Sequence, residues 1–583
     1  MKRITVLSVL VVVLMMVTPV LAFNPDTLVN VGSPPSPFSQ NKQNEPALAV
    51  DQNHPNILVS GANDNIDMEA CNAGNDTTCP FTTGVGVSGV YFSFDSGTTW
   101  TQPTYTGLTA RNCLGAVGNT DPNCTPQFGP IGTLPWYYEN GLVSDGDPAV
   151  AFGPVPGAGG SFSWTNGSRL YYANLTSNLS AVRSEEAFSG FEAVAVSRTD
   201  NVQAAAAGDK NAWMPPVVVS KQNTTLFSDK EQIWADNAAT SPYFGNVYIC
   251  DASFRSLSRG AASPVPIMVS LSSDGGDTWT TKQVTQAATN NQQGSRSGCT
   301  IRTDSKGVVY LFFTNFGIGT PGIGTHDLVK SYDGGHTWTR PQAIFTINDG
   351  CYNVDPVIGR CVEDGIAGAR MDLAPGPSVD IANGAPSGAG ATDVIVDSWS
   401  DGRFGLNQEA VMFSSSVDGG TTWSAPAPIS VTGDRGYYAA AAISPTGTDA
   451  YVVYNAFTTP YRTNTTDPRN LVGVVLHADM GADGAPGSWS VLHRSPGGDP
   501  RGSSQNNLQA EFLGDYVYAV ATNTYGAGVW NDTRNAADCP AIDAWRMALR
   551  TGASVTRPAP QQDCPATWGN SDIFGGSFPD PTP

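Results

Sequence analysis

The octet "SYDGGHTW" (331–338) decides the fold, because the chain repeats it in "SFDSGTTW" (93–100), "SSDGGDTW" (272–279) and "SVDGGTTW" (416–423). Each copy places an acid, a glycine and a final tryptophan at the same spacing. A carboxylate at such a place accepts backbone N–H groups of a turn, and glycine permits positive φ. We therefore predict four structural turns whose tryptophans pack between neighbouring units. Their residues are Asp95, Asp274, Asp333 and Asp418, with Trp100, Trp279, Trp338 and Trp423.

A second, weaker repeat consists of short apolar strands that open on polar residues. It is visible in "NEPALAVD" (44–51), "GDPAVAFG" (146–153), "DKEQIWAD" (229–236), "SGCTIRTD" (297–304), "PSVDIANG" (377–384), "GYYAAAAISP" (436–445) and "LGDYVYAVA" (513–521). A second strand follows each of them, and a third and a fourth flank each octet. Four-stranded units that recur every 60 to 100 residues or so are typical of a β-propeller.

The predicted fold is therefore all-β: a propeller of four-stranded antiparallel blades. Seven blades are preferred, and six remain an alternative because the second and sixth units lack an octet. The last unit shows only three strands, and the early segment "DTLVNVG" (26–32) is predicted to complete it and close the ring.

The ends of the chain and its charge indicate an exported protein. Residues 1–22 combine Lys2 and Arg3 with a long apolar stretch, which predicts a signal peptide. The propeller is then expected over 23–550, with a tail over 551–583, and no stable membrane insertion after cleavage. The net charge of −21 argues against nucleic acid as a partner, since phosphate binding needs a basic surface.

Ten cysteines in an exported chain predict disulfides. Their spacing favours Cys71–Cys79, Cys113–Cys124, Cys351–Cys361 and Cys539–Cys564, the last tying the tail, with Cys250–Cys299 left over. No CxxC pattern is present and the five histidines show no ligand spacing, so neither a zinc site nor another cofactor is predicted. Calcium held by loop carboxylates is compatible with the sequence.

The octets match the Asp-box, or BNR-repeat, pattern S-x-D-x-G-x-T-W. With its strand units, the chain resembles the sialidase-like Asp-box β-propellers over roughly 26–550. The resemblance implies that the octets lie on the face opposite the active site. Connections from strand four to the next blade, and from strand two to strand three, then build the functional face. The longest of these are 101–145 and 339–370, and all five predicted disulfides fall on that face.

A sialidase-type site needs three arginines that hold a carboxylate, a tyrosine nucleophile paired with glutamate, and a carboxylic acid. Candidates at strand openings are Arg296, Arg370 and Arg435 for the arginines, Tyr437 for the tyrosine, and Glu45, Asp147 and Asp229 for the acid. Tyr516, also at a strand opening, is a candidate for substrate binding. The family's Arg-Ile-Pro signature is absent, because "NEPALAVD" with Glu45 occupies its place. No Tyr–Glu pair is evident from the sequence.

Two further motifs fall on the expected functional face. "WSDGR" (399–403) and "WNDTR" (530–534) offer Arg403 and Arg534 either to their own aspartates or to an anionic ligand. Trp136 in "PWYYEN" (135–140) is either a platform for a sugar ring or a buried loop anchor.

Whether the protein is an enzyme stays open at this point. One hypothesis is a secreted exo-glycosidase resembling exo-α-sialidases, or another glycan hydrolase or lyase using Glu45, Asp147 or Asp229. The alternative is a non-catalytic propeller that binds an extracellular glycan or glycoprotein.

Overall fold

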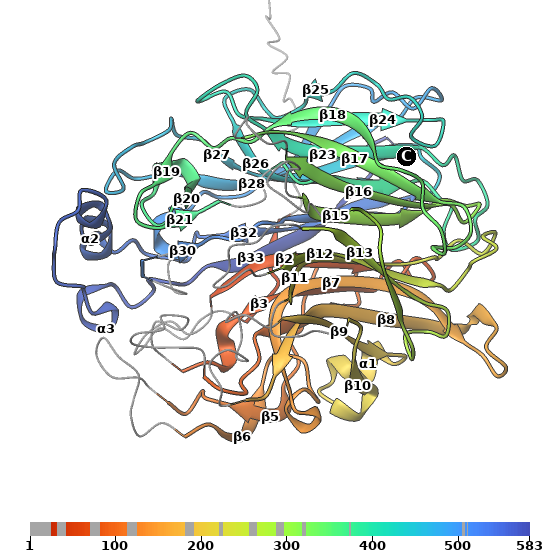
Figure 1. Cartoon of the computed structure of the whole chain (residues 1–583), viewed down its shortest axis with the longest axis horizontal. Coiled ribbons are helices and arrows are strands. Elements are labelled where there is room, and N and C mark those ends of the chain that lie inside the picture. Colours follow the sequence, from red (N-terminus) through yellow and green to blue (C-terminus); the bar gives the residue numbers. More distant parts are fainter. Residues whose placement is uncertain are drawn as a thin grey trace, which may run out of the picture.

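The computed structural model describes residues 25–31, 42–69, 82–113, 125–180, 192–220, 226–255, 265–286, 296–316, 322–371, 375–503, 508–509 and 511–582. Within them seven antiparallel sheets, six of four strands and one of three, form the blades, and three two-stranded sheets lie outside them. The prediction of a seven-bladed propeller is therefore confirmed, and the six-bladed alternative is wrong. Figure 1 shows the first blade (red, β2 and β3) between the last blade (blue, β32 and β33) and the second blade (orange, β7 and β8), as expected of a closed ring.

The first four blades each start on the strand that the apolar repeat predicts. Blade 1 contains β2 (Gln43–Val50), β3 (Leu58–Asp64) and β4 (Ser88–Ser93), followed by a hairpin of β5 (Tyr105–Thr109) and β6 (Gln127–Ile131). Blade 2 contains β7 (Leu142–Pro156), β8 (Phe162–Asn178), β9 (Ala193–Thr199), the short helix α1 (Val202–Ala206) and β10 (Trp213–Val218). Blade 3 contains β11 (Leu226–Ala235), β12 (Val247–Arg255), β13 (Ile267–Ser272) and β14 (Thr280–Gln283). Blade 4 contains β15 (Arg296–Thr303), β16 (Val309–Phe316), β17 (Ile323–Ser331) and β18 (Gln342–Asn348).

The remaining blades follow the same order. Blade 5 contains β22 (Ser378–Ile381), β23 (Ile395–Asp401), β24 (Ala410–Ser416) and β25 (Ala427–Pro428). Blade 6 contains β26 (Arg435–Ile443), β27 (Asp449–Phe457), β28 (Leu471–Asp479) and β29 (Ser490–Arg494). Blade 7 contains β31 (Tyr518–Ala521), β32 (Tyr525–Asp532), β33 (Asp572–Pro579) and β1 (Thr27–Leu28). Outside the blades lie β19 (Val354–Asp355), β20 (Arg360–Cys361), β21 (Ala369–Arg370), β30 (Glu511–Phe512) and the helices α2 (Pro540–Arg550) and α3 (Pro560–Asp563).

Both ends of the chain take part in closing the ring. The sheet order of blade 7 is β1-β33-β32-β31, so the N-terminal strand lies at its outer edge, beside a strand from the C-terminal segment. The segment 551–583, expected as a tail, therefore contributes the third strand of this blade. The first strand of each blade neighbours the first strands of adjacent blades, and β31 neighbours β2.

The octets of blades 3, 4 and 5 form turns between the third and fourth strands, and the octet of blade 1 forms a turn after β4, the last strand of its three-stranded sheet. In blade 1, Asp95 accepts hydrogen bonds from Ser93 Oγ (2.9 Å), Thr99 N (2.9 Å) and Thr99 Oγ1 (2.6 Å). Asp274, Asp333 and Asp418 accept the same set in their blades. These bonds hold the pKa of Asp418 at about 2, against opposing desolvation. Each octet is thus complete in itself, which is the behaviour of a structural turn.

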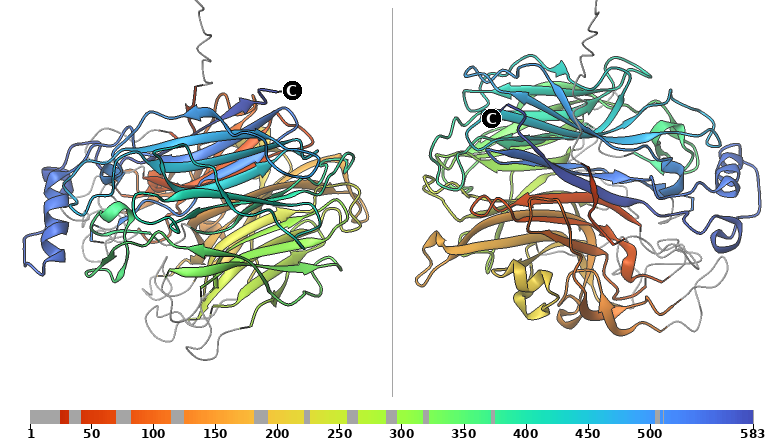
Figure 2. Two further views of the ribbon diagram at one scale, coloured as in Figure 1. Left: turned by 90° about the horizontal axis from the view of Figure 1, so that it is seen from above. Right: turned by 180° about the vertical axis from the view of Figure 1, so that it is seen from behind.

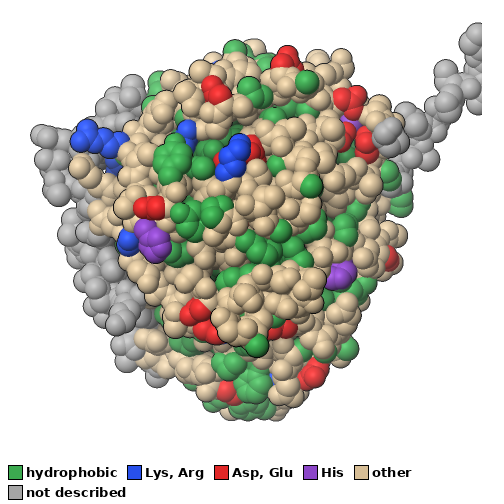
Figure 3. Space-filling view, turned by 90° about the vertical axis from the view of Figure 1, so that its right-hand side faces the viewer, with side chains coloured by type: hydrophobic (Ala, Val, Ile, Leu, Met, Phe, Trp, Pro, Cys, Tyr) green, Lys and Arg blue, Asp and Glu red, His purple; other side chains and the backbone are tan. Residues whose placement is uncertain are grey.

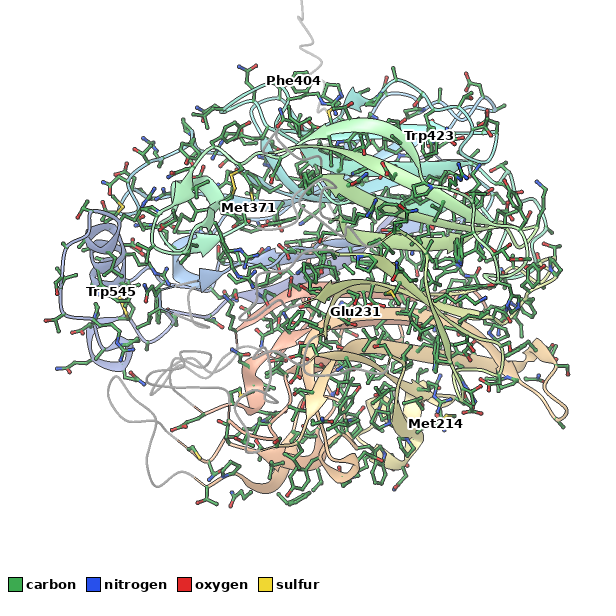
Figure 4. The ribbon with its side chains drawn as sticks, in the orientation of Figure 1. Met214, Glu231, Met371, Phe404, Trp423 and Trp545 are labelled. Atoms are coloured by element: carbon green, nitrogen blue, oxygen red, sulfur yellow. A yellow bond between two sulfur atoms is a disulfide. The ribbon has the colours of Figure 1, made fainter. Side chains whose placement is uncertain are left out.

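Apolar clusters fill the spaces between neighbouring blades, and the octet tryptophans pack against them. Trp423, which Figure 4 labels, meets the rings of Phe312 and Phe345 at centroid distances of 5.9 and 5.2 Å. Radial stacking in this way buries both faces of each sheet, which would otherwise be exposed to solvent.

The two ends of the propeller differ. Helices α2 and α3 and strands β19 to β21 and β30 project from one side (Figures 1 and 2). We call it the pore-mouth side, because it carries connections from strand four to the next blade. The opposite, octet side faces the viewer in Figure 3, where charged side chains are scattered among polar and apolar ones.

Three disulfides join described residues: Cys250–Cys299, Cys351–Cys361 and Cys539–Cys564, and all three match the predicted pairs. The predicted pair Cys71–Cys79, and Cys124 of the pair Cys113–Cys124, lie outside the described residues. No helix within the described ranges is long and apolar enough to cross a bilayer.

Candidate functional site

The first strands of five blades share an irregularity near their openings. The pairing register shifts in β2, β7, β11, β15 and β26. At each shift one residue has a left-handed backbone: Glu45 (φ 55°), Asp147 (49°), Lys230 (60°), Gly298 (50°) and Tyr438 (47°). Such a bulge re-aims one side chain, and a non-glycine residue there stores about 1–3 kcal/mol of strain, a feature that concentrates at functional sites.

Two of these bulge side chains, Glu45 and Asp147, meet around the ammonium group of a third, Lys230. Lys230 Nζ lies 2.5 Å from Asp515 Oδ2, 3.7 Å from both Asp147 Oδ2 and Asp229 Oδ1, and 3.8 Å from Glu45 Oε1. The four carboxylates come from blades 1, 2, 3 and 7, and we call the five residues the Lys230 cluster. It lies next to Glu231, which Figure 4 labels near the middle of the molecule.

Hydrogen bonds hold the cluster from behind. Asn63 Nδ2 donates to Glu45 Oε2 at 2.6 Å, and Asn63 Oδ1 accepts from the backbone of Asp147 at 2.6 Å. The backbone N–H of Asp515 donates to Glu45 Oε1 at 3.1 Å. The side-chain amide of Asn63 therefore positions both Glu45 and Asp147, and the backbone of Asp515 is hydrogen-bonded to Glu45.

Burial and mutual repulsion separate the pKa values of these acids. Burial raises the pKa of Asp229 to about 7, helped by the charge of Asp147 and opposed by Lys230. Burial, and then Asp147, also raises the pKa of Glu45 well above its usual range. The pKa of Asp147 is lowered, because Lys230 and hydrogen bonds from Glu45 and Asp229 outweigh its desolvation. Of these two neighbouring acids, Asp229 therefore holds a proton to a higher pH than Asp147 does.

A cavity of about 60 Å³ adjoins the cluster. First strands of blades 3 to 7 line it, and its polar lining includes Lys230, Arg302, Tyr438, Asp515 and Tyr516. Gly298 occupies the bulge position of blade 4 on the same wall. A space of this size holds a few water molecules but not a sugar ring.

Tyr438 forms a second pair at this cavity. Its hydroxyl donates to Glu363 Oε1. Burial raises the pKa of Glu363 to about 8 and that of Tyr438 well above its usual range. Tyr437, the candidate from the sequence, is buried and packs edge-on against Phe457 at 5.0 Å between the ring centroids. The bulge at Tyr438 explains the difference, since it re-aims that residue toward the cavity.

The three predicted arginines have different partners among the described residues. Arg435 pairs with Asp364 and, at 3.3 Å, with Glu409. The guanidinium group of Arg370 stacks on the ring of Phe512 at 3.7 Å. Arg296 Nη1 donates to the carbonyl of Gln286 at 2.8 Å. None of the three belongs to the lining of the cavity described above.

The two Asp–Arg motifs form intramolecular ion pairs. Arg403 binds Asp401 with two hydrogen bonds of 2.9 and 2.6 Å. Arg534 binds Asp532 in the same way, binds Asp26 near the N-terminus, and stacks on Phe574 at 3.8 Å. Bidentate pairs of this kind already satisfy the guanidinium groups.

The two aromatic candidates lie in different places. Trp136 is half-buried, its indole N–H donates to the carbonyl of Lys210 at 2.8 Å, and Lys210 Nζ lies 4.1 Å above its ring. These contacts are those of a loop anchor. Tyr516 lines the cavity, its ring centroid 5.3 Å from Lys230 Nζ, and its hydroxyl is buried with no hydrogen-bond partner within the described part of the chain.

Sequence reasoning missed Lys230, Asp515, Tyr438 and Glu363. The first three lie in the strand openings that the repeat identifies, each next to a residue that was selected. The sequence feature that could have identified them is their position, because they lie at first-strand openings equivalent to those that hold Glu45 and Asp147. Glu363 lies in a connection without a repeat, so nothing in the sequence pointed to it.

No family model and no curated protein matches the chain. Among solved structures, it is similar to the Hadza microbial sialidase Hz136, with 14% identity and a TM-score of 0.37 over 71% of this chain. The match spans 63% of that protein, less than two thirds of its length. It is also similar to the phage phi92 endosialidase (10% identity, TM-score 0.38, 96% of this chain and 69% of that one). A third similarity is to a Penicillium chrysogenum α-L-arabinanase, with 13% identity and a TM-score of 0.30 over 52% of this chain and 74% of that one. At these identities and scores, the fold assignment rests on the seven sheets themselves.

Proposed function

We propose that this chain is an extracellular glycosidase that acts on glycans at the pore-mouth side, with Asp229 as general acid. The observation that carries the proposal is the Lys230 cluster, where the pKa of Asp229 is raised to about 7 and that of Asp147 is lowered. Carboxyl groups whose surroundings push their pKa values apart are the usual acid and carboxylate of glycoside cleavage. The disulfides support an extracellular location.

Exposure distinguishes the roles of the acids. The side chain of Asp229 is 19% exposed, that of Asp147 9%, and those of Glu45 and Asp515 are fully buried. Asp229 is therefore the acid best placed to give a proton to the oxygen of the leaving group. Asp147, ionised and beside it, would stabilise the positive charge that develops on the sugar.

The contacts do not favour a sialic acid as the sugar. Arg435 is already paired with two acids, and Arg296 and Arg370 have separate partners, so a three-arginine clamp would require these contacts to break. Tyr438 with Glu363 is the type of pair that a tyrosine nucleophile needs. Its raised pKa values, however, argue against a phenolate near neutral pH.

The second candidate function is glycan binding without turnover. It is favoured by the small cavity, since a sugar would have to bind at the rim and leave the buried acids out of reach. In that case the Lys230 cluster is a structural lock that joins blades 1, 2, 3 and 7.

A panel of fluorogenic glycosides, with sialosides included, and a glycan array separate these functions. We expect hydrolysis of at least one glycoside by the wild type, loss of at least 100-fold in Asp229→Asn, and wild-type turnover in Asp418→Asn on the octet side. Array binding without hydrolysis would favour the second function. Silence in both assays would contradict both.

A further inference from the structure

A cluster of metal-ligand side chains lies on the octet side, far from the Lys230 cluster along the strands. Asp449, His477, Asp479 and Asp580 each offer one ligand atom, and these atoms lie within 4.8 Å of one another. His477 Nε2 is 3.1 Å from Asp449 Oδ1, 3.7 Å from Asp580 Oδ1 and 3.9 Å from Asp479 Oδ1. Separations of this size fit ligands around one ion at about 2.0–2.2 Å.

Strand pairing explains how the four residues meet. His477 and Asp479 are two residues apart on β28, so they share one face, and Asp449 is the register partner of Asp479 on β27. Asp580 directly follows β33 in the next blade. In blades 1, 3, 4 and 5 the third strand ends on the octet serine, whereas in blade 6 it ends on Asp479.

The hydroxyl of Tyr451 is a second, independent observation. Tyr451 is 1% exposed, and its hydroxyl has no hydrogen-bond partner in the part of the chain that the structure describes. It is the register partner of His477, with ring centroids 5.0 Å apart. A buried residue with an unpartnered hydroxyl therefore packs directly against the imidazole of this group of side chains.

Charge also indicates a cation at this place. Among the described residues, the only ion-pair partner of Asp449, Asp479 and Asp580 is His477. Three carboxylates, two of them with side chains only 7% exposed, are thus gathered around one imidazole. Like charges at this spacing are unfavourable without a counter-charge.

We propose that Asp449, His477, Asp479 and Asp580 bind a divalent transition metal ion of the zinc class. An imidazole among carboxylates suits zinc, whereas calcium takes oxygen ligands alone. The ion would tie the segment after β33 to blade 6 and so lock the last blade into the ring. The histidine spacing carried no signal for this site, because its ligands come from three separate segments.

The test is calorimetric titration of the chelator-treated, desalted full chain with zinc chloride. We expect one tight site in the wild type, at least 30-fold weaker binding in His477→Gln and Asp580→Asn, and unchanged binding in His54→Gln. His54 is a matched control because it pairs with Asp51 on the same side at 2.9 Å. Zinc at 100 times its dissociation constant should also raise the melting temperature of the wild type by about 2 °C.

Two outcomes would overturn the proposal. One is the absence of stoichiometric zinc binding in the wild type, including the case in which only calcium binds. The other is wild-type affinity in the ligand variants. If His477→Gln does not fold, Asp479→Asn serves instead, because the side chain of Asp479 is 62% exposed and its substitution leaves the core intact.

Discussion

Replacing Lys230 with methionine removes the one cation of a buried cluster that holds four acids. The ammonium is 9% exposed and lies within 2.5 to 3.8 Å of the four carboxylates. Removal of one partner from a buried ion pair lowers the free energy of unfolding by about 3–5 kcal/mol, because the other charge stays buried. For a propeller of this length the unfolding entropy is about 1.2 kcal/mol/K, so the expected fall in melting temperature is about 2.5–4 °C.

The loss should depend on pH in a defined direction. Lys230 opposes the raised pKa values of Asp229 and Glu45, so its removal raises both further. An acid whose pKa is higher in the folded state stabilises the fold at low pH, and this contribution is lost as pH rises through the folded-state value. The deficit of Lys230→Met should therefore be larger at pH 8 than at pH 5.

Thermal unfolding followed by tryptophan fluorescence at both pH values is the assay. Lys306→Met is the control, since Lys306 pairs with Asp393 at 2.8 Å while 75% exposed. Surface pairs contribute about 0–1 kcal/mol, so the control should melt within about 1 °C of the wild type. A Lys230→Met protein that melts like this control, or whose deficit is the same at pH 5 and pH 8, would refute the reasoning.

Three further predictions concern the octets, a disulfide and the cavity tyrosine. Asp418→Ala removes the acceptor of hydrogen bonds within its own turn and should lower the free energy of unfolding by about 1–2 kcal/mol. Glycan turnover or binding should stay unchanged, and a change in either would contradict a structural role for this residue. Replacing both Cys351 and Cys361, which are ten residues apart, with serine should lower the free energy of unfolding by about 2–3 kcal/mol. Denaturant titration measures this loss, and an unchanged midpoint of the unfolding transition would contradict the prediction. Tyr438→Phe should reduce glycan turnover or binding at least fivefold, whereas Tyr437→Phe should leave it unchanged. A larger loss in Tyr437→Phe than in Tyr438→Phe would contradict the conclusion that the bulge directs Tyr438 toward the cavity.

Local patterns made the fold predictable from the sequence. Each octet contains its own turn, with Asp333 and its hydrogen-bond donors only a few residues apart, so no long-range information was needed. The apolar repeat located the first strand of each blade for the same reason, since strand periodicity is local. The strand β33 was missed because "DIFGGSFP" carries no octet and follows two short helices.

The site was predictable only to the level of strand openings. Glu45, Asp147 and Asp229 do meet at one place, because equivalent positions of neighbouring blades converge at the axis. Which side chain of each opening faces the axis depends on a one-residue bulge, and periodicity does not encode it. The arginines show the other limit. Arg435 was a reasonable ligand candidate by position, yet Asp364 from a distant connection already neutralises it.

The pH dependence of turnover tests the central claim most directly, namely that Asp229 is a protonated acid near neutral pH. With the glycoside identified by the panel, kcat/KM of the wild type should be level below pH 6. It should fall about tenfold per pH unit above the pKa of Asp229, which is raised to about 7. A profile that stays level from pH 5 to pH 9, or that rises through pH 7, would contradict the account.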